Sequence, residues 1–123
     1  MVETNTITLT ATIASGASLS GAIDMSAFAL NKDNFRLFGI IMPAAWTTAN
    51  LTFQASFDSG LTWIDIMDAL GTEYTVIAGT SRYIPVDPTP FAAIPMLKIR
   101  SGTVSTPVNQ GADRIVALIM RAY

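Results

Sequence analysis

Four acidic side chains gathered in the middle of the chain are the residues best suited to chemistry. They are Asp58, Asp65, Asp68 and Glu73. Paired carboxylates can serve as the acid and base of a glycosidase, and carboxylate oxygens can bind calcium. However, Asp65 alternates with apolar neighbours in an expected strand and should point to solvent, while Asp68 falls in an expected loop. We interpret these carboxylates as a solvated face, with calcium binding and acid hydrolysis as lesser alternatives.

The rest of the composition argues against catalysis. The 123 residues include no cysteine and no histidine. This removes disulfides, thiolate nucleophiles, the commonest general base and the commonest transition-metal ligand. Only 13% of the residues are charged, compared with about 25% in a typical soluble domain. We expect a protein that is not an enzyme and that holds no cofactor or metal.

Charge and length also limit the partners. The net charge is −2 and the seven basic residues are scattered, which argues against a nucleic-acid binder. The start of the chain lacks the basic and apolar regions of a signal peptide. The longest apolar stretch, Leu37 to Trp46, is interrupted by Pro43 and is too short to span a membrane. We expect one domain over residues 1–123, with the N-terminal strand as a candidate arm that engages a neighbour.

Alternation with a period of two dominates the chain and predicts β-strands. In Thr6 to Ile13, for example, one face is apolar and the other is threonine. We expect strands at 6–13, 18–23, 36–42, 51–57, 63–67, 74–78, 82–86, 96–100 and 114–121, with 36–42 buried on both faces and Pro85 at an edge. A short helical turn near Met25 to Leu30 and a stiff connection at 87–90, where a cis bond could occur, complete the expectations. About eight or nine short strands without a long helix predict an all-β fold, an antiparallel β-sandwich or jelly roll.

The sharpest motif is Ser56-Phe57-Asp58-Ser59-Gly60-Leu61-Thr62-Trp63, which fits S-x-D-x-G-x-T-W. It predicts a hairpin in which Asp58 accepts backbone N–H bonds and Gly60 adopts a positive φ. The motif resembles the Asp-box of sialidases, but a single copy leaves no room for their propeller, and their catalytic residues have no counterpart here. We therefore interpret the motif as structural, with a ligand contact from Asp58 or Trp63 as the lesser alternative. Its defining residues are Ser56, Asp58, Gly60, Thr62 and Trp63.

Two wider resemblances concern fold and role. The order of elements over residues 37–121 is similar to the galactose-binding-like jelly roll. Residues 39–47, the hairpin, and residues 108–114 resemble small structural proteins of tailed bacteriophages. That resemblance implies a virion protein made in the host cytoplasm, of the capsid decoration, cement or head/tail accessory type. It also implies a homo-oligomer, by analogy a trimer at a capsid symmetry axis, docked on a major capsid or tail protein.

Several side chains are candidates for an interface. Trp46 is either a lid on the core or an exposed anchor, and arginines are enriched at interfaces because they pair with carboxylates. Asp113 and Arg114 could alternatively pair with each other. A carbohydrate-binding or receptor-binding module, with Trp46, Trp63 and Tyr83 stacking on a glycan, is the alternative function. The candidate interface residues are Trp46, Arg82, Arg100, Arg114 and Arg121.

Overall fold

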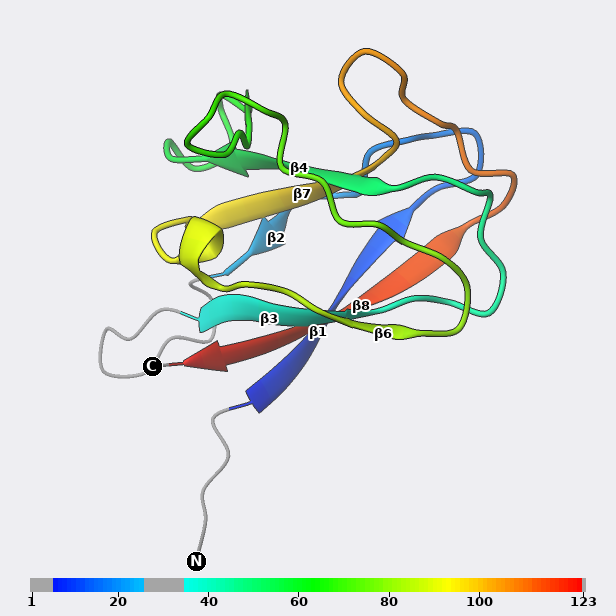
Figure 1. Ribbon diagram of the computed structural model, residues 1–123, viewed down its shortest axis with the longest axis horizontal. Coiled ribbons are helices and arrows are strands. Elements are labelled where there is room, and N and C mark those ends of the chain that lie inside the picture. The colour runs from blue at the N-terminus through cyan, green and yellow to red at the C-terminus, as the bar shows by residue number, and fades with distance from the viewer. Residues whose placement is uncertain (1–5, 26–34, 123) are drawn as a thin grey trace, which may run out of the picture.

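The computed structural model describes residues 6–25 and 35–122, which form two antiparallel four-stranded sheets packed face to face (Figure 1). The predicted all-β sandwich is confirmed, and the described residues contain no α-helix. Sheet A has the order β1 (Thr6–Ile13), β8 (Arg114–Ala122), β3 (Phe35–Ile41), β6 (Tyr83–Pro85). Sheet B has the order β2 (Ile23–Asp24), β7 (Met96–Ser101), β4 (Leu51–Ser56), β5 (Ile64–Asp65), and a 3-10 turn, η1 (Thr89–Phe91), precedes β7.

The pairing of β1 with β8 shows how the alternation in the sequence becomes a fold. The two strands pair antiparallel over the full length of β1, from Thr6 opposite Arg121 to Ile13 opposite Arg114. The four threonines of β1 are exposed, whereas Ala11 and Ile13 are buried. Because successive side chains of a strand point to opposite faces, the apolar half of β1 faces the core and the threonine half faces solvent.

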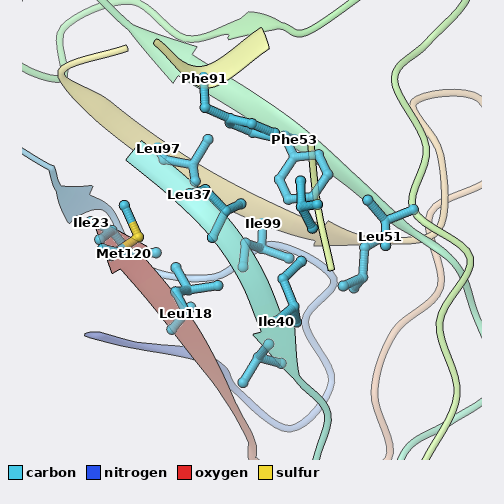
Figure 2. Close-up of a cluster of buried hydrophobic side chains, with 14 of the residues drawn as sticks. Ile23, Leu37, Ile40, Leu51, Phe53, Phe91, Leu97, Ile99, Leu118 and Met120 are labelled. Carbon is cyan, nitrogen blue, oxygen red and sulfur yellow. The ribbon is translucent and has the colours of Figure 1, made fainter. Parts of the chain in front are cut away.

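The core lies between the sheets and is built almost entirely from aliphatic side chains (Figure 2). The core includes an aromatic cluster in which Phe53 of β4 meets Phe91 of η1 edge-on, with ring centroids 5.2 Å apart. Tyr74 completes this cluster with a ring centroid 5.5 Å from that of Phe91. Edge-to-face contacts of this kind add specific attraction to the burial of apolar area.

Some sequence predictions were wrong in detail. The expected strand at 74–78 is an irregular segment that touches β4 through a single bridge between Val76 and Leu51. Segment 18–23 forms isolated bridges before the two-residue β2, and β5 is shorter than expected. The strand at 36–42 is not buried on both faces, because Ile41 is 43% exposed. All described peptide bonds are trans, and the helical turn expected at 25–30 lies, apart from Met25, outside the described residues. Within the described residues, no helix is long and apolar enough to cross a membrane.

We expect truncation of an inward residue of β8 to be far more costly than truncation of an outward one. Leu118 is fully buried between the sheets, whereas Ile115 on the other face of the same strand is 59% exposed. Leu118→Ala should lower the free energy of unfolding by about 2–5 kcal/mol, because it leaves a cavity. Ile115→Ala, the control, should change it by less than about 0.5 kcal/mol. Urea denaturation measures both, and equal losses would contradict the assignment of the two faces.

Candidate functional site

The outer face of sheet B carries a cluster of charged side chains centred on Arg100. Its guanidinium donates to Asp65 Oδ1 at 2.8 Å and to Glu73 Oε2 at 3.2 Å. A third bond runs from Arg100 Nη1 to Thr52 Oγ1 at 3.3 Å. Arg100 is only 6% exposed, and the two carboxylates neutralise its charge where water cannot. The arginine predicted as an interface residue is therefore occupied within the fold, and Asp65 is not the solvated carboxylate that its strand position suggested.

Glu73 ties this cluster to a second loop. Its carboxylate accepts the backbone N–H of Val104 at 3.1 Å, and Met67 and Glu73 form an isolated bridge. The segment after β5 thus folds back over the outer face of sheet B. This return explains why Arg100, which alternates with the core residues Leu97 and Ile99 and so points away from the core, is nevertheless buried.

The Asp-box-like hairpin has the geometry that its motif predicts. Asp58 Oδ1 accepts the backbone N–H of Thr62 at 2.8 Å and the hydroxyl of Ser56 at 2.9 Å. Gly60 has a φ of 89°, a conformation that glycine adopts without strain, and donates its N–H to Ser56 Oγ at 2.8 Å. Trp63 Nε1 in turn donates to the carbonyl of Gly60 at 3.1 Å. All five motif residues serve the turn itself.

Asp68 shapes the next turn in the same way. Its Oδ1 accepts the backbone N–H groups of Leu70 at 2.8 Å and Thr72 at 3.0 Å. Two of the four candidate carboxylates therefore hold turns, and the other two hold Arg100. Among the described residues no group of His, Cys, Asp or Glu side chains could hold a metal ion. All four carboxylates therefore bind groups of the chain itself.

The three aromatic residues considered for glycan stacking are not brought together. Trp46 is 8% exposed and belongs to the core cluster, in agreement with the lid interpretation rather than the exposed anchor. Trp63 lies in the hairpin of sheet B, where Lys98 Nζ stands 4.4 Å from the ring centroid, a cation–π contact. Tyr83 lies on β6 of sheet A, where its ring covers Gly39 so closely that a Cβ there would overlap it. These rings form no shared platform.

The remaining candidate arginines have different surroundings. Arg114 donates to Gln110 Oε1 at 3.2 Å and to Thr47 Oγ1 at 3.3 Å, and Asp113 instead accepts the backbone N–H of Ser15. The fully buried Gln110 also donates to Ser101 Oγ at 2.7 Å. Sequence reasoning missed this network because a glutamine in a polar loop carries no signal of burial. Arg82 and Arg121 are exposed.

The outer face of sheet A has the opposite character from that of sheet B. At one end of this face Thr6 of β1 lies opposite Arg121 of β8, which in turn lies opposite Arg36 of β3. Beyond that end, Thr8, Thr10 and Thr12 lie opposite Ile119, Ala117 and Ile115 of β8, and Ala117 lies opposite Ile41 of β3, which pairs with Tyr83 of β6. We call these residues the threonine–isoleucine face. The strands of sheet A contain no acidic residue, and their three charged residues are Arg36, Arg114 and Arg121. Ile115 is 59% exposed and Tyr83 54% exposed, so the face presents apolar area to solvent.

The chain matches no protein-family model, no curated protein and no solved structure.

We expect loss of the Arg100 side chain to destabilise the protein. Arg100→Met leaves Asp65 and Glu73 partly buried without their cation, which should lower the free energy of unfolding by about 2 kcal/mol. Arg82→Met is the matched control, because Arg82 is exposed and its guanidinium donates to the backbone carbonyl of Thr80, with no acidic partner among the described residues. It should change stability by less than about 0.5 kcal/mol. Thermal or urea unfolding measures the difference, and equal effects would contradict the assigned role of Arg100.

Asp58 gives a prediction about pH. Hydrogen bonds from the Thr62 backbone, then from the Thr62 and Ser56 hydroxyls, hold the pKa of its carboxyl below the ordinary value of 3.8. The stabilisation from the ionised form is therefore present above that value and is lost as the pH falls through the lower folded pKa. Ser56→Ala removes one of these donors and should raise the pKa of Asp58 toward the ordinary value. Carbon-13 NMR titration of the carboxyl measures it, with the remote Ser105→Ala as control; an unchanged pKa in Ser56→Ala would refute the argument.

Proposed function

We propose that this chain is a non-enzymatic structural subunit of a virion, which assembles with copies of itself and docks on a larger protein shell as a capsid decoration or head accessory protein. The observation that supports this most is the threonine–isoleucine face, which carries no acidic residue and has Arg36 and Arg121 at one end. The resemblance to small structural proteins of tailed bacteriophages supplies the setting. Sheet A is the part of the molecule that we assign to contact with the shell.

The physical argument concerns desolvation. A face of threonine, alanine and isoleucine loses little when it leaves water, whereas lysine or glutamate side chains must be stripped of strongly held water. Interface cores are likewise depleted in charged residues. Exposed apolar area gathered on one face of a small protein commonly marks a contact surface. On sheet B the strands carry the Arg100 cluster on their outer face, and the exposed apolar residues Phe57, Leu61, Met67 and Leu70 lie in loops outside the strands.

The alternative function, a carbohydrate-binding or receptor-binding module, has less support. Trp46 is buried, Trp63 stacks against Lys98, and Tyr83 lies on the other sheet with one side of its ring against Gly39. A sugar-binding platform would need at least one free aromatic face beside converging polar groups. The outer side of Tyr83 is such a face, but it borders apolar residues such as Ile41.

We expect the protein to be present on purified virus particles, and we expect a charged residue introduced into the threonine–isoleucine face to prevent its binding to them. Immuno-electron microscopy of particles from the genome that encodes the chain tests its position. Ile115→Glu places a charge within the threonine–isoleucine face and should abolish co-sedimentation with particles that lack the protein. Ile77→Glu, the same change at a residue that is 78% exposed outside sheet A, should leave it intact. Absence from particles, or equal behaviour of the two variants, would overturn the proposal.

A further inference from the structure

The four edges of the two sheets are protected very unequally. β2 and β5 have two residues each, and β6 has three residues including Pro85, which has no N–H to donate. β1 is the exception, with eight residues that include neither a charged residue nor a proline. Proteins usually protect an edge strand by shortening it or by adding lysine, proline or a bulge, since unpaired backbone groups invite another strand.

The hydrogen bonds at the end of β1 show which backbone groups face this edge. The carbonyl of Thr12 accepts the N–H of Gly21, which lies on the side away from β8. Because backbone groups alternate in direction along a strand, the even-numbered residues of β1 point to the edge and the odd-numbered residues bond to β8. Among the described residues, no strand pairs with the edge formed by Thr6, Thr8 and Thr10.

We propose that this edge pairs with the same edge of a second copy, antiparallel about a two-fold axis at Thr8. This inference deepens the self-assembly part of the proposed function. Thr8 then lies opposite Thr8 of the second copy, Thr6 opposite its Thr10, and Thr10 opposite its Thr6. Each of the three pairs exchanges two backbone bonds, about six in all. The register uses the backbone N–H and carbonyl groups of Thr6, Thr8 and Thr10 and leaves the Thr12 carbonyl with Gly21.

The side chains favour a second copy over an unrelated strand. On the inner face, Ile7 and Leu9 are only partly buried, in contrast to the buried Ala11 and Ile13. In the proposed register Ile7 lies opposite Leu9 of the second copy as a non-hydrogen-bonded pair, in which side chains approach most closely. On the outer face threonines lie opposite threonines. Both faces of the strand are therefore self-complementary.

The pairing makes one eight-stranded sheet whose outer side joins the threonine–isoleucine faces of two copies. The interface is isologous, so it closes with two copies and differs from the trimer that a capsid three-fold axis would favour. Its area is small, and we therefore expect a dimer that dissociates on dilution.

Amide hydrogen exchange of the unmodified protein tests the edge directly. In a concentrated sample, where light scattering gives the mass of a dimer, exchange at the N–H groups of Thr8 and Thr10 should slow by at least roughly tenfold relative to a dilute sample. The N–H groups of Leu9 and Ala11, bonded to β8, should be protected in both. Unchanged exchange at Thr8 and Thr10 would overturn the pairing, as would a protein that stays monomeric at every concentration.

Two substitutions at one position separate edge pairing from other contacts. Thr8→Pro removes an N–H that faces the edge, so it should abolish the dimer while β1 stays paired with β8. Thr8→Val retains the N–H and the branched side chain and should dimerise normally. Ile115→Glu should also dimerise normally; if it does while failing to bind particles, the edge and the docking face are separate. The inference would be refuted if Ile115→Glu failed to dimerise, or if a folded Thr8→Pro variant still dimerised. If Thr8→Pro does not fold, the hydrogen-exchange experiment alone decides.

Discussion

The packing of alternate residues from two sheets into one core is the constraint on which the rest of this structure depends. A strand that buries one face against the opposite sheet leaves its other face without a core to join. The outer face of sheet B is covered in part by the ion cluster around Arg100 and by the segment after β5, which folds back across that face. Sheet A has no such cover among the described residues and presents threonine and isoleucine to solvent. The asymmetry between the two outer faces, rather than any constellation of reactive groups, is what distinguishes this chain.

The four central carboxylates show how acidic residues can be used without chemistry. Asp58 and Asp68 each bind backbone N–H groups of their own turns, which fixes the local path of the chain. Asp65 and Glu73 neutralise a guanidinium that could not otherwise be removed from water. The ion pairs withdraw Asp65 and Glu73 partly from the surface, whereas Asp58 and Asp68 hold their turns while remaining exposed.

The sequence predicted best the segments that pair over a long stretch or bond locally, and it predicted worst the segments held by few or distant contacts. The long alternating segments at 6–13 and 114–121 were predicted almost residue by residue, because both of their faces have a defined environment. The hairpin at 56–63 was also predictable, since its bonds are local. The segment at 74–78 has strand-like composition but meets β4 through one bridge only, which composition cannot reveal. The burial of Arg100 depends on the return of a distant segment, and the buried Gln110 has no local signature at all.

The contact between Gly39 and Tyr83 also affects whether further strands can add to the edge of sheet A opposite β1. The ring of Tyr83 fills the space that a side chain at position 39 would need, and so fastens the short β6 to β3 at the edge opposite β1. A sheet with one edge open to pairing can join only one further sheet there, whereas a sheet open at both edges can add copies without limit. The missing side chain of Gly39 thus lets a three-residue strand that ends in proline occupy the edge of sheet A opposite β1.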